Sequence, residues 1–194
     1  QINYTCCYNF ITTSIIYSDK GYIIEAEQEI YVAFRIKEAS QAGALVSKGT
    51  SALGSTFRAG TFTSYNPQSN YLNFISVMAS EDNTQVTIND LDQNIDILDF
   101  DESALGNNGL GNLNDIVFTL NRGQSYIIAL RADQGADVDA SIEVNSNQRA
   151  NGDGLIGALI SSNKSIVVNS GSLNGSFYEG NGRDYGFDQI VDLN

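Results

Sequence analysis

The chain contains no histidine, and this absence excludes more chemistry than any residue that is present. Without imidazole there can be no Ser-His-Asp or Cys-His catalytic constellation, and the usual nitrogen ligands of zinc and copper are missing. Carboxylates are nearly all that remains for catalysis, and hard oxygens, which suit Ca²⁺ or Mg²⁺, are the remaining metal ligands. We therefore expect no enzyme activity, no catalytic residues, no cofactor and no essential transition metal.

Cysteine and proline are also scarce. The two cysteines, Cys6 and Cys7, are adjacent, so a bridge between them would close no useful loop and could not staple a small core. Their role stays open, and they do not decide the redox compartment. A single proline stands against 18 glycines, a composition that is typical of an all-β protein with many tight turns.

Positive charge is in short supply as well, with 10 Lys and Arg against 23 Asp and Glu and a net charge of −13. Such a surface repels phosphate backbones and anionic lipids, so we expect neither nucleic acid nor a membrane surface as a partner. No apolar run approaches the roughly 20 residues that cross a bilayer, so we expect no membrane insertion. Because no initiator Met or signal peptide precedes Gln1, we expect a mature chain or a fragment of a longer protein.

One pattern of sixteen residues occurs twice. Residues 21–36 align without gaps on residues 157–172, and each copy has a glycine, a short apolar run, four polar residues and a β-branched run. This pattern predicts a β-hairpin, turning at 26–28 in the first copy and at 162–164 in the second. Alternation would then place Ile24, Ile30 and Val32 in the same environment as Ile160, Ile166 and Val168.

Short alternating or β-branched segments recur along the whole chain, whereas no segment carries a sustained helical stripe. The segments that predict strands are 12–17, 22–25, 29–36, 44–48, 58–64, 72–79, 85–88, 115–120, 125–130, 140–144, 157–161 and 165–170. Asn121-Arg-Gly123 predicts a hairpin turn, and residues 99–114 and 172–183 predict longer loops.

These segments predict an all-β fold of tandem, antiparallel, sandwich-like modules with repeated hairpins. Propeller-like blades are the alternative architecture. We expect residues 1–56 to end a first module, residues 57–172 to form a central one and residues 173–194 to begin another.

The acidic segment from Asp90 to Glu102 is the best candidate for metal binding. Its carboxylates, which could supply oxygens to Ca²⁺, are Asp90, Asp92, Asp96, Asp99, Asp101 and Glu102. Their spacing does not match a calcium-loop pattern, so a solvated acidic face is the favoured interpretation. Residues 145–154 resemble a calcium loop only loosely, since they lack the closing acidic residue.

Tyrosine is abundant, at 10 residues, while tryptophan is absent. Exposed tyrosines would suit a protein-binding or carbohydrate-binding face. Because most aromatic side chains of β modules pack in the core, the core is the favoured location.

Several motifs, taken in order, resemble those of the IgGFc-binding-protein-like modules. They are Gln41–Gly49 with Ala52–Gly54, Val77–Thr87, Leu120–Tyr126, Gly154–Gly157, Ser162–Val168 and Gly182–Leu193. The resemblance extends over about residues 18–194 and is greatest to large secreted surface proteins of Bacteroidota. Those proteins carry a gliding-motility-type C-terminal sorting domain and are exported by type 9 secretion.

The resemblance implies an extracellular, non-enzymatic β module of a bacterial secreted or cell-surface protein that acts in adhesion or gliding motility. It also implies contact with the type 9 translocon during export, through a C-terminal domain not present here, and a protein or glycan ligand of unknown identity. Two alternatives stay open: a carboxylate-based carbohydrate-active enzyme, and a cargo or assembly component of a secretion complex.

Overall fold

The structure, a computed structural model, describes residues 13–38, 41–61, 73–92, 95, 97–100, 115–130, 154–175 and 184–193. More than half of these residues lie in strands, and they include no α-helix, only the short 3₁₀ helix η1 (Gly49–Ala52). The strands are β1 (Ile16–Tyr17), β2 (Ala33–Glu38), β3 (Gln41–Val46), β4 (Gly54–Arg58), β5 (Asn73–Ala79), β6 (Thr84–Asn89), β7 (Ile116–Leu120), β8 (Ser125–Ala129), β9 (Leu159–Gly175) and β10 (Asp184–Gln189). The predicted all-β, antiparallel fold is confirmed.

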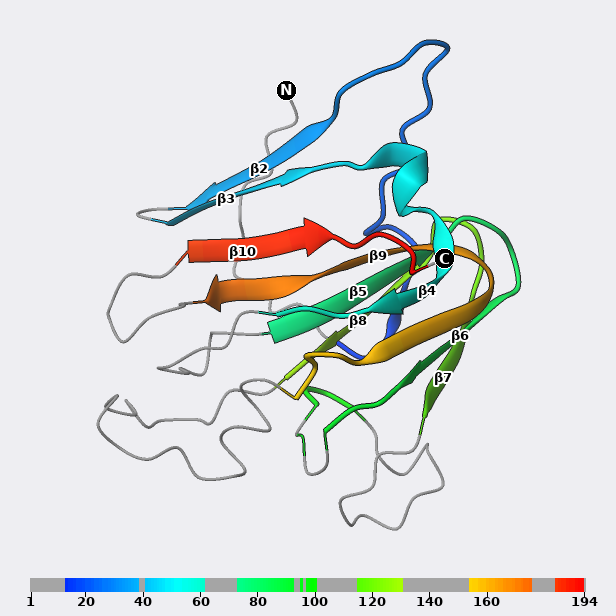
Figure 1. The fold of residues 1–194 in the computed structure, drawn as a ribbon, viewed down its shortest axis with the longest axis vertical. Coiled ribbons are helices and arrows are strands. Elements are labelled where there is room, and N and C mark those ends of the chain that lie inside the picture. The colour runs from blue at the N-terminus through cyan, green and yellow to red at the C-terminus, as the bar shows by residue number, and fades with distance from the viewer. Residues whose placement is uncertain are drawn as a thin grey trace.

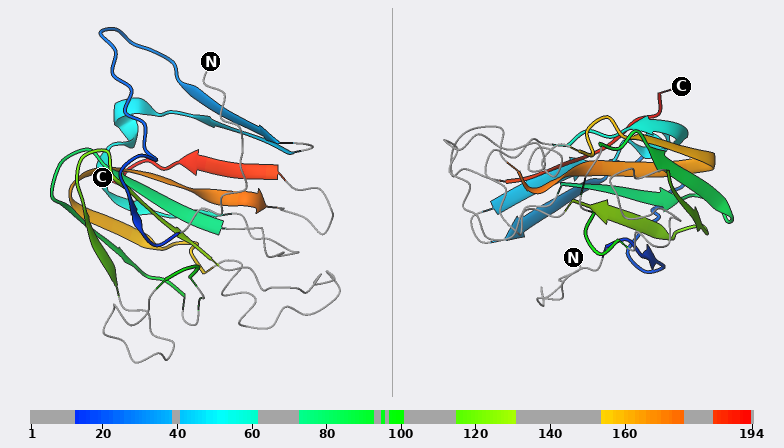
Figure 2. Two further views of the ribbon diagram at one scale, coloured as in Figure 1. Left: turned by 180° about the vertical axis from the view of Figure 1, so that it is seen from behind. Right: turned by 90° about the horizontal axis from the view of Figure 1, so that it is seen from below.

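Eight strands form one antiparallel sheet in the order β1-β8-β5-β9-β6-β7, with β4 and β10 also paired to β9. The long strand β9 organises this sheet, because β6 pairs with its first part and β5 with its second part. Figure 1 shows β9 bending between its gold beginning and its orange end, and Figure 2 shows the same bend from behind. The sheet is therefore folded over on itself.

The fold in the sheet lies where residues 80–83, 121–124 and 162–165 run beside one another; we call these residues the corner. Here β5 continues into β6 along β9, and β7 continues into β8 alongside them. The predicted hairpin at Asn121–Gly123 is thus wrong, because β7 pairs with β6 while β8 pairs with β5. Asn83 and Gly123 both adopt positive φ, which asparagine and glycine tolerate best.

Side-chain oxygens complete the backbone hydrogen bonding at the corner. The Asn121 amide oxygen accepts from the Asn83 N–H at 3.1 Å, and the Asp82 carboxylate accepts from the Arg122 N–H at 3.0 Å. On the other side, the Asn163 amide oxygen accepts from the Gln85 N–H at 2.8 Å. The polar residues that predicted turns therefore satisfy backbone donors where three neighbouring strands bend together.

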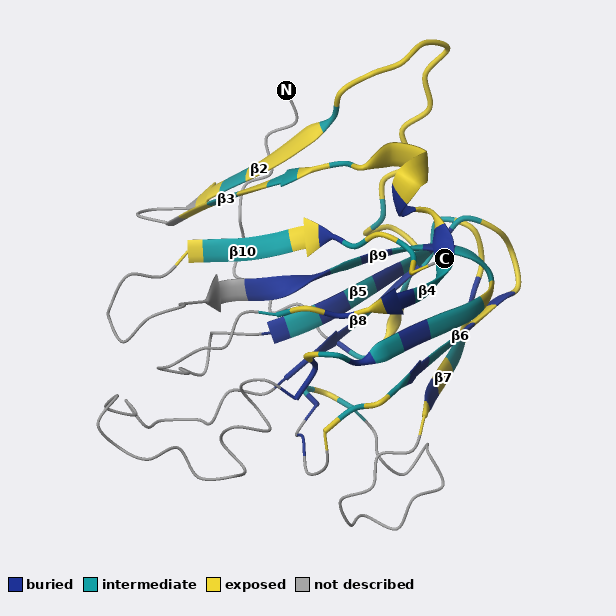
Figure 3. Cartoon of the chain, viewed as in Figure 1, coloured by how far each residue is buried: buried dark blue, intermediate teal, exposed yellow. Residues whose placement is uncertain are grey.

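One hydrophobic core fills the space between the two halves of the folded sheet. Along β5 every second residue is buried, and β6 shows the same alternation. Figure 3 shows the buried residues on β4 to β9, whereas β2 and β3 carry exposed and half-buried residues. All of the following large, fully buried side chains belong to this one cluster: Phe57, Ile75, Val77, Val86, Ile88, Ile116, Leu120, Ile128, Leu155, Ile160 and Ile166.

The sixteen-residue repeat does not form two equivalent hairpins, so that prediction is wrong. The second copy is part of the continuous strand β9, because β4, β5 and β6 supply pairing partners on both sides of residues 162–164. In the first copy, residues 21–32 form no strand, and only its end becomes β2. Ile24 and Ile30 are 60% and 57% exposed, whereas the matched Ile160 and Ile166 are fully buried.

Other predicted elements differ in detail. The segment 22–25 is not a strand, and β10 is a strand that the sequence analysis did not predict. The predicted strand 140–144 lies outside the described residues, as do residues 101–114 and 176–183 of the predicted loops. The predicted module boundaries at 56/57 and 172/173 fall within β4 and β9, and the division into modules stays a prediction.

Candidate binding surface

A ribbon that lies outside the hydrophobic core is made of residues 21–38 and 41–46; we call it the arm. Its strands β2 and β3 pair in antiparallel register, from Ala33 opposite Val46 to Glu38 opposite Gln41. They form a sheet of their own, which lies beside β10 in Figure 1. The arm is therefore held by side-chain packing and by its anchor residues, outside the strand ladder of the main sheet.

Large apolar side chains of the arm are exposed to solvent. Tyr31 is 77% exposed, Tyr22 is 62% exposed and Phe34 is 51% exposed, and Ile23, Ile24, Ile30 and Val46 are exposed as well. Exposed apolar residues gathered on one segment usually mark an interaction surface. The expectation that tyrosines lie mainly in the core therefore fails for the arm.

Close packing against β10 fixes the position of β3 and β2. Gly43 lies over Tyr185, and a Cβ atom at position 43 would come within 2.6 Å of the Tyr185 Cβ. The Phe34 and Phe187 rings meet edge to face with centroids 6.4 Å apart, a favourable aromatic geometry. The Asp184 carboxylate accepts a hydrogen bond from the Ala42 N–H at 2.8 Å.

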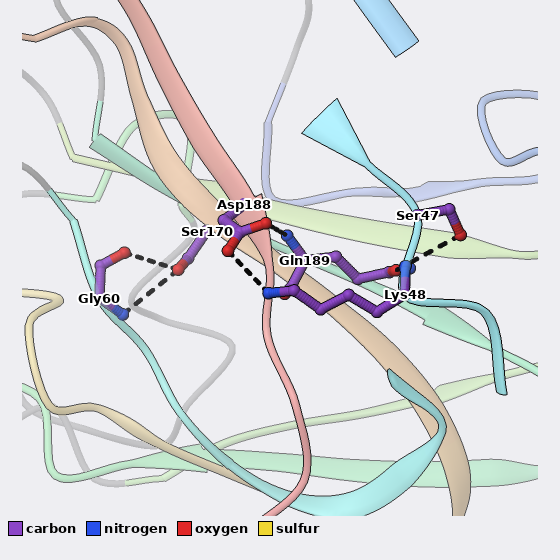
Figure 4. Close-up of polar contacts among 6 residues, drawn as sticks. All are labelled: Ser47, Lys48, Gly60, Ser170, Asp188 and Gln189. Carbon is purple, nitrogen blue, oxygen red and sulfur yellow. Dashed lines mark hydrogen bonds and ion pairs between the residues drawn. The ribbon is translucent and has the colours of Figure 1, made fainter. Parts of the chain in front are cut away.

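A polar anchor then ties the end of the arm to the end of β10 (Figure 4). The Lys48 ammonium donates to the Asp188 carboxylate at 2.7 Å and also to the Gln189 backbone oxygen. The Lys48 backbone N–H donates to the Gln189 side-chain oxygen at 2.6 Å. Gln189 is buried while Asp188 is largely exposed, so we expect the glutamine to be the more important partner.

A second polar contact in Figure 4 joins β9 to the chain after β4. The buried Ser170 hydroxyl accepts from the Gly60 N–H at 3.2 Å and donates to the Gly60 carbonyl at 2.6 Å. One hydroxyl thus satisfies both backbone groups of a residue beside the core.

The structure describes three of the six candidate calcium ligands. The Asp90 carboxylate forms an ion pair with Arg58 at 2.5 Å, and the Asp99 carboxylate accepts from the Thr13 N–H at 3.2 Å. The Asp92 backbone N–H donates to the Gly154 carbonyl at 3.2 Å. Asp96, Asp101 and Glu102 lie outside the described residues, as do residues 145–153 of the second candidate loop.

Within the described residues, no three His, Cys, Asp or Glu side chains lie together as a metal site would require. Calcium binding at Asp90–Asp101 stays the untested alternative to the favoured solvated acidic face. The ion pairs of the described residues lie at the surface. They join Asp19 to Lys20, Glu25 to Arg122, Asp90 to Arg58 and Asp188 to Lys48.

Tyr126 is buried, in contrast to the exposed tyrosines of the arm. Its ring stacks on Phe118 with centroids 4.2 Å apart and is 7% exposed. Burial raises the pKa of its hydroxyl above the ordinary value, and a hydrogen bond with Ser14 offsets part of this rise.

The sequence analysis did not identify the arm as a surface, although one signal was available. Charged residues interrupt its apolar pattern closely, at Glu25, Glu27 and Glu29 and again at Arg35 and Lys37. In the second copy of the repeat, Lys164 is the only charged residue. The density of charged residues within each β-like pattern could therefore have predicted which copy is exposed and which is buried.

An all-β antiparallel module with an anchored, exposed apolar arm and ion-paired carboxylates on its outside has the features of a binding module. The chain belongs to the IgGFc binding protein family, because the model of this family, described as IgGFc binding protein, matches residues 42–194. Searches of curated proteins and of solved structures found no match. The family match begins in β3, so β2 and the first part of the arm precede it.

In the described part of the chain, no helix has the length and the apolar character that a membrane span requires.

Proposed function

We propose that this chain is a non-enzymatic, extracellular binding module of a bacterial secreted or cell-surface protein. The observation that carries the proposal is the family match, which extends from β3 to the end of the described residues and thus includes nearly the whole folded sheet. The net charge of −13 supports it further, because an acidic surface favours solubility and disfavours nonspecific contact with nucleic acid.

The finer proposal is that the parent protein acts in adhesion or gliding motility and leaves the cell by type 9 secretion. It is supported by the motifs that resemble those of Bacteroidota surface proteins. Contact with the translocon would be made by a C-terminal sorting domain of the parent protein, so the module itself needs no export residues.

Surface accessibility on intact cells tests this proposal. Cells that encode the parent protein are treated with a non-permeant biotin reagent, in a wild-type strain and in a strain that lacks the type 9 translocon. We expect the module to be labelled in the wild type and to be retained, unlabelled, in the deletion strain. Labelling in both strains would reject the type 9 route, and labelling in neither would reject the extracellular location.

The name of the family raises binding of the Fc part of immunoglobulin G as a second candidate function. Biosensor measurements with purified Fc and Fab fragments test it directly. Saturable binding of the chain to Fc and not to Fab would support this function. An absence of binding to Fc at concentrations up to about 100 µM would reject it, because such weak affinity leaves less than about 6 kcal/mol of binding free energy.

The two alternatives from the sequence have less support. A carbohydrate-active enzyme needs two carboxyl groups about 5–10 Å apart in a cleft, whereas the ion-paired carboxylates described above face cations at the surface. Release of reducing ends from a polysaccharide panel would favour that alternative over the binding module. Co-purification with translocon subunits in the absence of the sorting domain would favour an assembly component.

A further inference from the structure

The arm has an open edge. Among the described residues, β2 pairs with β3 on one side and with no strand on the other. The Ser47 N–H donates to the Val32 carbonyl at 2.9 Å, which sets the hydrogen-bonding phase of this ladder. Because bonded and non-bonded positions alternate in antiparallel pairs, Ala33, Arg35 and Lys37 direct their N–H and C=O groups away from β3. These groups form a template for another strand.

The side chains of β2 divide into two faces. Val32, Phe34 and Ile36 alternate on one face, where Phe34 meets Phe187 of β10 and its two neighbours are half-buried. Residues 31, 33, 35 and 37 are exposed on the other face. A strand added to the open edge would therefore continue an apolar face on one side and a charged face on the other.

The segment Glu29–Lys37 is complementary to itself when it is read in the opposite direction. If two copies meet with Ala33 opposite Ala33, Val32 lies opposite Phe34 and Ile30 lies opposite Ile36. In the same register Tyr31 lies opposite Arg35, and Glu29 lies opposite Lys37. Every pair is then apolar, aromatic with a cation, or opposite in charge, and each of these combinations stabilises antiparallel strands.

The hydrogen-bonding phase limits the choice of register. Residues with outward backbone groups must face each other, so only registers that pair odd positions with odd positions are available. A shift of the centre to Val32 would place Gln28 opposite Ile36, and a shift to Phe34 would place Ile30 opposite Glu38. The register centred on Ala33 avoids both mismatches.

We propose that the open edge of β2 binds residues 29–33 of a second copy of this chain, and the reverse, in an antiparallel dimer centred on Ala33. Residues 29–32, which form no strand in the single chain, extend β2 in the dimer. The dimer covers the exposed Ile30 of each copy with Ile36 of the other and joins the two arms into one four-stranded sheet. Within the described residues, Glu29, Arg35 and Lys37 form no ion pair of their own, so their charges are available to the second copy. Because β2 precedes the family match, the inference does not depend on the proposed function.

The net charge of −13 opposes association of two copies, so the affinity is expected to be moderate. The paired segment 29–37 is much shorter than the roughly 20–30 residues that each partner contributes to a standard interface, which also favours a reversible dimer. Sedimentation velocity at about 150 mM salt, where screening is physiological, should show the mass rise from 21.0 kDa toward twice that value as concentration increases from about 1 to 200 µM. A monomer throughout this range would overturn the proposal.

Charge reversal tests the register itself. Glu29→Lys and Lys37→Glu each place like charges opposite each other twice in the dimer, and each variant alone should dimerise about tenfold more weakly. A mixture of the two variants should form a heterodimer, because every like pair becomes an opposite pair. The double variant Glu29→Lys with Lys37→Glu should recover the wild-type dissociation constant.

The control is Lys20→Glu, which reverses an exposed charge outside the segment and should leave dimerisation unchanged. Far-UV circular dichroism of each variant shows that the fold is intact, and recovery in the mixture excludes misfolding as the cause of a loss. A dimer that tolerates both reversals, or a mixture that fails to associate, would place the contact elsewhere and overturn the proposal.

Discussion

The two copies of the repeated sequence show how one β pattern can have two opposite fates. Residues 159–172 of the second copy lie in β9 in the centre of the sheet, whereas residues 21–36 run along the exposed arm. Both copies carry apolar or aromatic residues at their second to fourth and tenth to twelfth positions. The second has strands on both sides, while the described neighbour of the first is β3 alone. Burial therefore follows from which strands supply partners along the edges, and the apolar pattern alone does not decide it.

The residues at the end of each copy explain why only one can enter the core. Ser170 and Gly171 of the second copy correspond to Phe34 and Arg35 of the first. Gly171 faces Phe187 of β10 so closely that a Cβ atom would overlap the Phe187 backbone, and Ser170 bonds Gly60. An arginine at position 171 would push β10 away from β9, and a phenylalanine at position 170 would displace the chain at Gly60.

The largest expected effect comes from truncating matched isoleucines in the two copies. Ile166→Ala removes a fully buried side chain and should lower the free energy of unfolding by about 2–5 kcal/mol. Ile30→Ala removes a side chain that is 57% exposed and should change it by less than about 0.5 kcal/mol. Urea unfolding followed by circular dichroism measures both.

The measurement on Ile30→Ala is made at about 1 µM chain, where association through the arm does not contribute. Equal losses in the two variants would contradict the contrast between the copies, because they would mean that the arm is part of the cooperative core.

A side chain added at Gly171 is expected to have the next largest effect. Gly171→Ala introduces a methyl group where β10 leaves no space, and overpacking of this kind costs about 1–3 kcal/mol. Gly60→Ala is the matched control, because a Cβ atom there meets nothing within 4 Å. Thermal melts should show a clear decrease for the first variant and little change for the second. A neutral Gly171→Ala would mean that β10 can move away at no cost.

Removing the anchor of the arm should have a local effect of about 1–2 kcal/mol. Gln189→Leu leaves the Lys48 N–H without its side-chain acceptor at a half-buried position. Asp188→Asn removes only the ion pair with Lys48, whose partners are 34% and 68% exposed, and should cost at most about 0.5 kcal/mol. Hydrogen exchange measured by mass spectrometry should show faster exchange in β2 and β3 for the leucine variant, with the exchange of β5 unchanged.

Local patterns predicted much of the sheet correctly. The alternating segments 72–79, 85–88, 115–120 and 125–130 correspond to β5, β6, β7 and β8 within one or two residues. Each has apolar residues at every second position and polar residues at its end, so the local signal and the tertiary environment agree.

The predictions that failed concern which strands are partners. Turn residues at 121–123 and 162–164 predicted hairpins, but the chain bends there without pairing back on itself. Turn-forming residues are the same in a hairpin and in a bend between two strands that do not pair with each other. Only the pairing with distant strands distinguishes the two structures. The arm was missed because its apolar pattern resembles that of the buried copy, and only its denser charges, at Glu25, Glu27 and Glu29, indicated an exposed segment.

A smaller effect on stability, which depends on pH, should distinguish the buried Tyr126 from the exposed tyrosines of the arm. Burial raises the pKa of Tyr126 above its ordinary value of 10.0 in the folded state. Its contribution to stability is therefore fully present below about pH 10 and is lost as the pH rises through the folded pKa. Urea unfolding at pH 9, 10 and 11 should show a steeper loss for the wild type than for Tyr126→Phe. Parallel losses would mean that Tyr126 ionises equally easily in both states.

The smallest effect on the melting temperature is expected from adding calcium. This experiment tests whether the acidic segment 90–102 is a solvated surface, like the charged face of the arm. Asp90 is paired with Arg58, and Asp99 accepts a hydrogen bond from Thr13, so binding an ion would require these contacts to be exchanged. We therefore expect the melting temperature to be the same in 1 mM Ca²⁺ and in chelator. An ion present at 100 times its dissociation constant would add about 2.7 kcal/mol and raise the melting temperature by several degrees. A rise of that size, abolished by Asp99→Asn and not reproduced by Mg²⁺, would contradict this expectation and identify the acidic segment as a calcium site.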